Sequence, residues 1–488
     1  MTNAIPPVIA AAEIADWSDE VDVLVVGLGI AGGCAAVEAA AAGARVLVLE
    51  RAAVPGGTSA LSGGHFYLGG GTAVQQATGH ADSPEEMATY LTAVSLDPER
   101  EKIRAYCQGA AAHLDWLEGL GFEFERSYYP KKAAIQPGTQ GLMYTGNEKV
   151  WPFCDLAVPA PRGHKLPVAG DTGGGKLVTD LLVRRAADLG VEVRCETWAA
   201  NLVADEAGAV VGVAWRHFEK EGFIRARSII IAAGGFVMNR DMVADHVPML
   251  AEKPYVLGST YDDGLGIRLG ESAGGATRFM DQAFVTATIY PPARRVTGLI
   301  VNRDGQRFVA EDSYHSRTSG FVMQQPGRVA YLILDSAHMG DEPSMAPFLD
   351  GWESIAEMER ALGMPTGALQ WTITRYNDNA ARGEDPDFHK AKEWLEPQDQ
   401  GPWGVYDLSL GKAMYAGFTL GGLACTVEGE VLRADGSVIN GLYAAGACAA
   451  NLAQDSLGYS SGTQLGEGSF FGRRAGSHAA ARRSAMPA

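Results

Sequence analysis

Residues 21–50 constrain the fold of this chain more than any other segment, because they contain the parts of a dinucleotide-binding unit in order. Apolar residues at positions 21 and 23–26 predict a buried strand. Gly27, Gly29 and Gly32 follow with the spacing G-x-G-x-x-G, and an alanine-rich segment predicts the next helix. A second predicted strand, residues 45–49, ends in Glu50. Together these parts predict a Rossmann-like nucleotide site.

Each part of this unit has its own physical role. Gly27 allows a tight turn, Gly29 lets a pyrophosphate approach the backbone, and Gly32 lets the helix pack closely on the sheet. The free N–H groups at the start of the helix would point at the phosphates. Glu50 stands about twenty residues past the glycines, where a carboxylate binds a ribose hydroxyl pair and disfavours a 2′-phosphate.

Length, charge and cysteine spacing limit the class of protein. A chain of 488 residues exceeds one ordinary core, so two domains are expected. The net charge of −18 would repel nucleic acid and anionic membranes, so small molecules are the expected partners. Six widely spaced cysteines without a C-x-x-C pair predict no metal site and the reduced thiols of a cytoplasmic protein. The first residues do not have the pattern expected of a signal peptide, and no uncharged run reaches the about 18 residues that span a bilayer.

Three separated segments indicate a single cofactor domain with an insertion. They are the N-terminal unit, residues 227–236 (RSIIIAAGGF) and residues 441–446 (GLYAAG), which precede a predicted closing helix. Between them, residues 282–416 are richer in proline, arginine and aromatic residues, with helix-like runs near 352–362 and 369–381. The predicted domains are a first part of the cofactor domain at 1–281, an inserted catalytic domain at 282–416 and a second part of the cofactor domain at 417–488.

Longer motifs resemble a known flavoprotein superfamily. Residues 56–71 (GGTSALSGGHFYLGGG), together with IIIAAGGF and GLYAAG, resemble the FAD-binding framework of the succinate dehydrogenase and fumarate reductase flavoproteins. Residues 158–164 (VPAPRGH), 418–423 (FTLGGL) and 458–476 (GYSSGTQLGEGSFFGRRAG) are most similar to the 3-ketosteroid dehydrogenases, especially the Δ4-(5α) type. The resemblance implies an α/β fold, with a Rossmann-like FAD-binding domain and an inserted α+β catalytic domain that caps it.

The resemblance also implies how the flavin is held. A helix that begins near Thr463 would place its positive end beside flavin N1 and the C2 carbonyl, where negative charge develops on reduction. Thr58 and Ser59 stand where relatives with covalent flavin carry a histidine, so we expect noncovalent FAD. The predicted FAD-binding residues are Gly27, Gly29, Ala31, Gly32, Glu50, Arg51, Gly57, Thr58, Ser59, Ser62, Gly63, Gly64, Ala233, Gly234, Gly446, Gly462, Gln464 and Leu465.

Two substitutions separate this chain from the dicarboxylate reductases of the superfamily. Phe418 stands where those enzymes carry a histidine, and Gln464 stands where they carry an arginine. Because both losses remove groups that bind carboxylates, a neutral, apolar substrate fits the sequence better.

The ketosteroid type uses tyrosines and a serine instead. Tyr459, Ser461 and Gly462 match its GYSSG motif, and Tyr314 matches the tyrosine that its inserted domain contributes. Desaturation requires a base that removes a proton α to a ketone, donors that stabilise the enolate, and hydride transfer from the β carbon to flavin N5. We assign Tyr459, the Gly462 amide and Tyr314 to ketone binding and base work, with Ser461 supporting proton transfer. Which tyrosine is the base stays open at this point.

The predicted activity is therefore FAD-dependent α,β-desaturation of a cyclic ketone, with a 3-ketosteroid Δ4-(5α)-dehydrogenase as the first hypothesis. Alternatives are Δ1-dehydrogenation, desaturation of a smaller cyclohexanone-type ring, a fumarate-reductase-like alkene reductase, and a flavin-binding protein without activity. The electron acceptor would be a separate, unidentified partner.

Other features fit structural roles better. Residues 170–176 (GDTGGGK) have the spacing of a phosphate-binding loop but lack the serine or threonine for magnesium, so a helix entry is predicted. His164 and His315 have no partner in the sequence that would mark them as catalytic. Tyr128 and Tyr129 would either line the substrate pocket or lie in a loop before Pro130.

Overall fold

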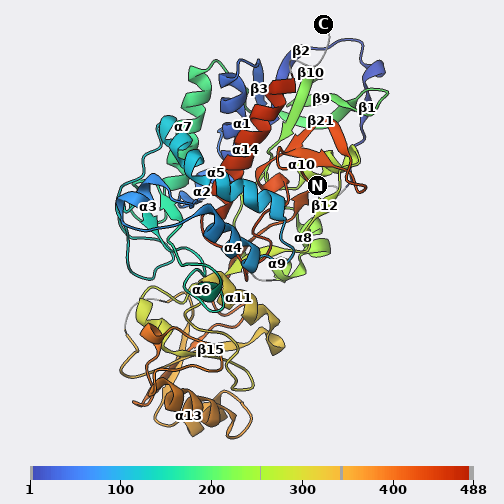
Figure 1. The fold of residues 1–488 in the computed structure, drawn as a ribbon. Helices are drawn as coiled ribbons and strands as arrows, with labels where there is room; N and C mark the ends of the chain where they lie inside the picture. The colour runs from blue at the N-terminus through green and yellow to red at the C-terminus, as the bar shows by residue number, and fades with distance from the viewer. Residues whose placement is uncertain (1–3, 253, 341–343, 483–488) are drawn as a thin grey trace.

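The structure is a computed structural model that describes residues 4–252, 254–340 and 344–482. Figure 1 shows a larger part built around the first and last segments of the chain, and a smaller part around β15 (Ala330–Asp335) and α13 (Ala368–Ala380). The two parts meet near α11 (His315–Gln324) and α6 (Phe153–Leu156).

A parallel sheet forms the centre of the larger part. β2 (Asp19–Val26) lies between β10 (Lys220–Ile231) and β3 (Val46–Leu49), and it is parallel to both. β7 (Glu192–Arg194) extends the sheet beyond β3, and β21 (Val438–Ala444) extends it beyond β10. The paired segments of β2 and β3 are almost entirely buried apolar residues, as expected for parallel strands covered on both faces. The strands predicted at residues 23–26, 45–49 and 227–231 are all present.

On the edge away from β2, β10 pairs with two different strands. Its first half pairs antiparallel with β9 (Val210–His217), whereas its last residues, 229–231, pair parallel with β21. β9 in turn pairs with β8 (Trp198–Ala204), and β8 pairs with β1 (Ile9–Ala10). A single long strand therefore joins an antiparallel meander to the parallel nucleotide-binding sheet.

The last helix packs directly on the first. α14 (Thr463–Ala481) lies against α1 (Ile30–Ala41), and both cross the central sheet (Figure 1). A Cβ added at Gly472 would overlap the carbonyl oxygen of Ala31, so this close approach requires glycine. The two ends of the chain thus build one cofactor-binding unit, which agrees with the return of the chain inferred from GLYAAG.

Further elements surround this unit. α7 (Gly174–Asp188) begins inside GDTGGGK after Gly173, whose φ is 86°, which confirms the predicted helix entry. A small sheet places β6 (Gly163–Lys165) between β4 (His65–Tyr67) and β5 (Leu142–Met143). The other elements of the larger part are α2 (Gly57–Leu61), α3 (Ala73–Ala77), α4 (Pro84–Val94), α5 (Arg100–Gly119), α8 (Arg240–His246), α9 (Pro248–Glu252), α10 (Leu265–Ser272), β12 (Thr277–Arg278), β19 (Gly422–Leu423) and β20 (Glu430–Leu432).

The smaller part has its own antiparallel sheet, called the distal sheet here. Its order is β14 (Leu299–Asn302), β15, β17 (Trp403–Asp407) and β16 (Phe348–Trp352). α12 (Ile355–Ala361) and α13 pack on it around a separate apolar core, and they match the helices predicted near 352–362 and 369–381. All of these elements come from residues inside the predicted insertion.

A three-stranded sheet connects the two parts. In it, β18 (Ala416–Thr419) pairs with β13 (Ala283–Thr286) and β11 (Tyr255–Val256). Its strands therefore come from both the cofactor-binding residues and the predicted insertion. Over the described residues, no helix combines the length and the apolar character needed to cross a bilayer.

Candidate active site

A cavity of about 980 Å³ lies at the carboxyl ends of the parallel strands, bordered by Val26, Leu49, Ala232 and Ala445. This is where open α/β sheets bind ligands. The predicted residues that border it are Gly27, Gly29, Ala31, Glu50, Arg51, Gly57, Thr58, Ser59, Ser62, Gly63, Ala233, Gly234, Gly446, Tyr459, Ser461, Gly462, Gln464 and Leu465. Residues from both ends of the chain thus face one cavity. Gly32, Gly64 and Tyr314 are the predicted residues that lie outside its lining.

The glycines divide between backbone packing and the cavity wall. A Cβ at Gly27 would lie 2.5 Å from the carbonyl oxygen of Ala232, and one at Gly32 would overlap the carbonyl oxygen of Gly27. Gly64 packs in the same way on Gly174 at the start of α7, not against the cavity. Gly29 caps α1 without a side-chain hydrogen bond of its own, and the first amide of the helix, Ile30, donates to the Ser59 hydroxyl. The next N–H groups and the positive end of the helix face a ligand in the cavity.

Glu50 is held at the cavity wall by the backbone. Its Oε2 accepts a hydrogen bond of 2.8 Å from the Leu28 amide, and its Oε1 accepts one of 2.8 Å from the Ala52 amide. Burial raises the pKa of this carboxyl, and the amides act in the opposite direction. Beside it, Arg51 pairs with Asp263 at 2.7 Å and lies over the ring of Tyr261. These bonds fix both side chains before any ligand binds.

Thr58 and Ser59 make structural hydrogen bonds. The Ser59 hydroxyl accepts from the Ile30 amide at 3.0 Å, which joins α2 to the start of α1. The Thr58 hydroxyl donates to Asp262 and accepts from the Ser259 amide at 2.7 Å. Among the described residues that border the cavity, His65 is the one histidine, and its Nε2 lies 2.7 Å from Gln136 Oε1. Burial lowers the pKa of His65 to about 4.

The N-terminus of α14 borders the opposite side of the cavity. The helix begins at Thr463, as predicted, after Gly462 with φ of 97° and no side-chain cap. A Cβ at Gly462 would lie 2.7 Å from the Tyr67 amide nitrogen, so glycine is required at this close approach. The Gln464 side chain donates to Asn451 at 2.8 Å. The Thr463 amide donates to the Ser460 carbonyl at 3.2 Å, and the Gln464 amide bonds the Tyr459 hydroxyl, so what this helix end offers a ligand is chiefly the positive end of its dipole.

Aromatic side chains surround the candidate catalytic residues. Phe284 on β13 stacks on Phe418 with ring centroids 4.7 Å apart, and it lies 4.4 Å from the ring of Tyr459. Tyr314 belongs to the same buried apolar cluster. The structure therefore brings Tyr314, from the start of α11, next to Tyr459 and Ser461, from the segment before α14.

The two tyrosines have different surroundings. Burial raises the pKa of both hydroxyls above the ordinary value, while the Gln464 amide acts in the opposite direction on Tyr459 and Ser461 does so on Tyr314. The Tyr314 hydroxyl is buried and makes no hydrogen bond of standard geometry in the described chain, and Ser461 is the neighbouring hydroxyl that lowers its pKa. Tyr459 and Ser461 border the cavity, whereas Tyr314 lies behind Ser461.

The catalytic end of the cavity is neutral and apolar. Its wall there consists of Phe418, Thr419, Tyr459, Ser461 and Gln464. Of the described residues that line the cavity, those with basic side chains are Arg51, which is already paired with Asp263, and His65, whose lowered pKa keeps it neutral near pH 7. No fixed cation of the described chain is therefore placed to hold a substrate carboxylate beside the tyrosines.

The remaining candidates lie away from the cavity. His164 bonds Thr72 through Nε2 at 2.9 Å and the Arg162 carbonyl through Nδ1 at 3.0 Å, and burial lowers its pKa to about 4. His315 contacts Thr286, and burial lowers its pKa to about 3. Tyr128 packs on His80 with ring centroids 4.3 Å apart, and the Tyr129 amide bonds the Leu142 carbonyl.

Several residues at the site carry no signal in the sequence. Phe284 sits in a short apolar strand, and Asp262, which bonds Thr58, follows no recognisable motif. Asn147 accepts a hydrogen bond from the Tyr314 amide although its own segment resembles an ordinary loop. These contacts join segments that are far apart in the chain.

Comparison with known proteins is consistent with this geometry. Residues 22–466 match the family described as FAD binding domain. The chain belongs to this family. A solved structure of the 3-ketosteroid-Δ4-(5α)-dehydrogenase from Rhodococcus jostii RHA1, in complex with 4-androstene-3,17-dione, is 40% identical with a TM-score of 0.92, and the match covers 98% of this chain and 100% of that one. The resemblance to the ketosteroid dehydrogenases is thereby confirmed, and this FAD-binding protein is an oxidoreductase.

Curated relatives extend the range of chemistry in the family. This FAD-binding protein is 29% identical to a 3-oxo-5-alpha-steroid 4-dehydrogenase of Comamonas testosteroni, over 90% of its own length and 94% of the relative. It is 27% identical to a probable fumarate reductase of Shewanella frigidimarina, over 97% of its own length and 77% of the relative. The residues of the cavity suit FAD, because two uncapped helix N-termini and the fixed Glu50 carboxylate face the same space.

Proposed function

We propose that this oxidoreductase is a 3-ketosteroid Δ4-(5α)-dehydrogenase, which converts the C4–C5 single bond of a saturated 3-ketosteroid into a double bond. The observation that carries the proposal is the neutral aromatic end of the cavity, which is lined by Phe418, Tyr459 and Ser461. Phe284 and Tyr314 pack against these residues from outside the cavity. Such a wall suits a flat, apolar ring system with one ketone. The similarity to the Rhodococcus jostii enzyme supports the same substrate class.

FAD is bound noncovalently in this proposal and supplies the acceptor for the hydride that leaves the β carbon. Glu50 binds the ribose hydroxyls, and the N-terminus of α1 binds the pyrophosphate. Thr58 and Ser59 occupy the position of an attachment histidine and are already hydrogen-bonded within the protein. The N-terminus of α14 stabilises negative charge on the bound ring system.

Ketone activation belongs to Tyr459. Tyr459 and Gly462, at the start of α14, both line the cavity, and we assign the Tyr459 hydroxyl and the Gly462 amide as the two donors. Two donors on the ketone oxygen stabilise the enolate that forms when the α proton leaves. The high pKa that burial gives Tyr459 suits this role, because a hydroxyl that stays protonated can donate.

Proton removal belongs to Ser461 together with Tyr314. Ser461 borders the cavity, and Tyr314 lies behind it without another partner in the described chain. A proton that leaves the α carbon therefore meets Ser461 first and Tyr314 second. The transfer balances when Tyr314 reacts as the phenolate: Ser461 takes the α proton while its own hydroxyl proton passes to the Tyr314 oxygen, which ends as a neutral hydroxyl. Burial opposes the phenolate of Tyr314, and the neighbouring Ser461 hydroxyl favours it.

In this proposal each domain of the chain has its own role. Residues 282–416 act as the inserted domain, which supplies Phe284 and Tyr314 and excludes water from the ketone. Residues 1–281 and 417–488 hold FAD. The reduced flavin passes its electrons to a separate acceptor.

Anaerobic bleaching of the yellow holoenzyme tests the proposal. A saturated 3-ketosteroid of the 5α series should bleach the flavin, and the product should carry the C4–C5 double bond. Succinate should leave the colour unchanged, because no cation is available for its carboxylates. Rapid bleaching by succinate, or no bleaching by any ketone, would overturn the proposal.

The identity of the product distinguishes the related reactions. A 1,2 double bond would keep the tyrosine chemistry and replace the Δ4 assignment with Δ1-dehydrogenation. Bleaching by a simple cyclohexanone but by no steroid would assign the smaller ring. Acid precipitation should release FAD into the supernatant, whereas colour retained in the pellet would show a covalent link.

A further inference from the structure

One short turn, residues 145–148 (TGNE), contacts both residues assigned to proton removal. We call it the junction turn. The Asn147 side chain accepts a hydrogen bond of 2.9 Å from the Tyr314 amide, and the Thr145 carbonyl accepts one of 2.8 Å from the Ser461 amide. Tyr314 starts α11 and Ser461 precedes α14, so the turn lies between the two helix ends that carry the proton-removing pair.

Tyr90 on α4 makes a second connection between the same two sides. Its hydroxyl accepts a hydrogen bond of 2.8 Å from the Asn147 amide and lies 3.1 Å from the Ser460 hydroxyl, beside Ser461. Gly146 allows this approach, because an added Cβ would overlap the Ser460 hydroxyl. The Asn147 backbone is therefore linked to Ser460 through the Tyr90 hydroxyl, and the Asn147 side chain is bonded directly to the Tyr314 amide.

Glu148 holds the turn through hydrogen bonds of its carboxylate. It is buried, its Oε1 accepts from the Tyr67 hydroxyl at 2.9 Å, and its Oε2 accepts from the Gly146 amide at 3.0 Å. The Tyr67 amide in turn donates to the Gly462 carbonyl at 2.9 Å. The turn is thus connected to the segment that supplies the second ketone donor, and its backbone cannot shift alone.

The Asn147 side chain is fully buried, yet only half of it is used. Its Oδ1 accepts from Tyr314, whereas its Nδ2 has no partner in the described chain. An unpaired buried N–H group destabilises a folded protein, so asparagine at this position costs stability. The Oδ1 bond to Tyr314 is the contact that explains why the side chain is there.

We propose that Asn147 is a positioning residue that fixes the Tyr314 hydroxyl relative to Ser461. It touches neither substrate nor flavin and acts through the start of α11. Without the Oδ1 bond the first turn of α11 is free to move, and the two hydroxyls no longer keep a common geometry. A displacement of about 1 Å at a reacting group is enough to slow a reaction by about 10²-fold. The inference rests on the proposed desaturation of a ketosteroid.

The test is single-turnover bleaching of the holoenzyme by a saturated 5α-3-ketosteroid, with and without deuterium at C4. Asn147→Leu removes the Oδ1 acceptor and should slow bleaching by about 10²-fold, with a larger isotope effect from C4 and an almost unchanged steroid dissociation constant. Asn147→Asp keeps the acceptor oxygen and should stay within about threefold of the wild type, since the geometry of the bond is retained. If Asn147→Leu does not fold with bound flavin, Asn147→Ser, which is too short to reach the amide, replaces it.

Asn302→Leu is the matched control. Asn302 is also a buried asparagine whose Oδ1 accepts backbone amides, from Asp304 at 3.0 Å and Gln306 at 3.1 Å, but it lies in the distal sheet. Its variant should lose stability and keep the wild-type rate per bound flavin and the wild-type isotope effect.

The outcomes separate the two proposals. If the wild type bleaches and a folded Asn147→Leu or Asn147→Ser bleaches equally fast, the positioning role is wrong. If Asn147→Asp is slow and its isotope effect equals that of the wild type, the rate has fallen although the acceptor for the Tyr314 amide is kept and proton removal is not the slowed step. That result would also overturn the positioning role. No bleaching of the wild type by any ketosteroid would overturn the proposed function, and the positioning role with it.

Discussion

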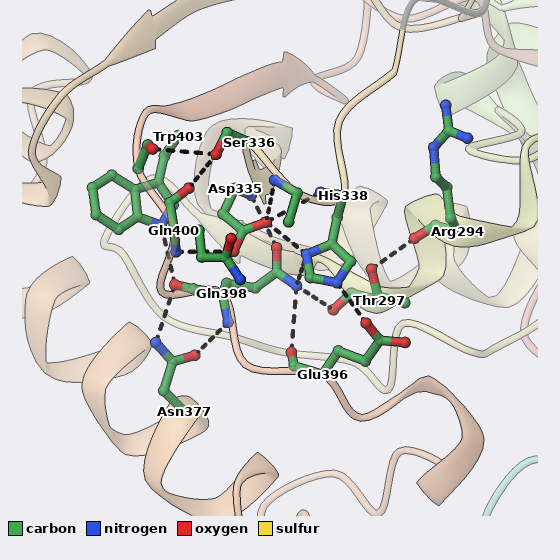
Figure 2. A network of polar contacts seen from close by, with 12 residues as sticks. Arg294, Thr297, Asp335, Ser336, His338, Asn377, Glu396, Gln398, Gln400 and Trp403 are labelled. Atoms are coloured by element: carbon green, nitrogen blue, oxygen red, sulfur yellow. Dashed lines mark hydrogen bonds and ion pairs between the residues drawn. The ribbon is translucent and has the colours of Figure 1, made fainter.

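The distal sheet and the junction between α11 and α14 use buried polar groups in opposite ways. In the distal sheet, Gln398 is buried and hydrogen-bonded at both ends of its amide, to the Asp335 amide at 3.0 Å and the Thr297 carbonyl at 3.3 Å. Figure 2 shows this network, in which His338 lies between Asp335 and Glu396. The side chains of Asp335, His338, Asn377 and Gln398 in this network each make hydrogen bonds.

At the junction, by contrast, several buried polar atoms have no partner in the described chain. They are found in the junction turn, on Thr145 and Asn147, and just before and within α11, on Asp312, Ser313, Tyr314 and Thr318. Unpaired buried groups are costly, and folded proteins retain them mainly where chemistry or bound water needs them. We infer that the distal network stabilises the fold. At the junction, unpaired hydroxyls and amides near the cavity lower the stability of the fold and remain available for chemistry.

The largest expected effect is at the cavity end of the junction. Tyr459→Phe should lower turnover by about 10²-fold or more, which is the scale for one positioned donor to an oxyanion. FAD should stay bound, since the Gly27 and Glu50 region is unchanged. Steady-state turnover per bound flavin measures this effect. Tyr376→Phe, which removes a buried hydroxyl that donates to Thr297 in the distal sheet, should keep the wild-type rate.

Tyr314→Phe should lower turnover by about 10²-fold, because Ser461 loses the group that takes its proton onward. The variant should be as stable as the wild type or more stable, since the deleted hydroxyl has no partner in the described chain. Thermal melting and turnover are measured on the same sample. A clear loss of stability would show that the hydroxyl is structural and would weaken the contrast between the two regions.

Glu50→Ala should weaken FAD retention rather than the chemistry of bound flavin. Charge-assisted hydrogen bonds contribute about 1.5–3 kcal/mol, so the FAD dissociation constant should rise about tenfold to a hundredfold. Flavin fluorescence after dilution measures release. Unchanged occupancy would remove Glu50 from the ribose site, whereas a lower turnover per bound flavin would extend its role to catalysis.

Gln398→Leu in the distal network should reduce the free energy of unfolding by about 1–3 kcal/mol, because it leaves the Asp335 amide and the Thr297 carbonyl with fewer partners. Turnover per bound flavin should be unchanged. Denaturant unfolding and turnover are compared with the wild type. A large loss of turnover without a loss of stability would show that the distal sheet takes part in the reaction.

The smallest effect is a pH dependence of stability from His338. Asp335 and Glu396 raise its pKa above the ordinary value although burial opposes them. The protonated form is therefore favoured in the folded state, and its contribution is full below the unfolded pKa of about 6.5 and is lost as pH rises through the folded value. Because the side chain is partly exposed, less than about 1 kcal/mol is expected. His338→Gln should flatten this part of the stability profile above pH 6, and an unchanged slope would assign it to other groups.

Local patterns in the sequence were enough for the cofactor-binding unit. The strand, glycines and acid of residues 21–50 are fixed by spacing within about thirty residues, and the structure places them as β2, α1 and β3. The start of α14 at Thr463 follows from the glycine before it. The absence of cations at the catalytic end was also visible in Phe418 and Gln464, because it is a matter of residue type at matched motif positions.

The tertiary structure decided how distant segments meet. Gly64 shows this, since an added Cβ would meet Gly174 on α7, a contact that no motif in the sequence indicates. There are three further cases. Ser461 lines the cavity while Tyr314 lies outside its lining, Phe284 stacks on Phe418, and the Asn147 side chain accepts a hydrogen bond from the Tyr314 amide.

There is a physical reason why some of these features could be predicted from the sequence and others could not. Strand, turn and helix-cap signals depend on the conformational preferences of neighbouring residues, so they can be read along the chain. Contacts such as Asn147 with Tyr314 depend on how separately formed elements pack, and packing depends on the shapes of many side chains at once. The amino-acid sequence alone therefore indicated a dinucleotide cofactor, which the family match supports, and predicted a neutral substrate. The packing of distant segments was needed to show that Ser461 lines the cavity, that Tyr314 lies outside its lining, and that the junction turn contacts both.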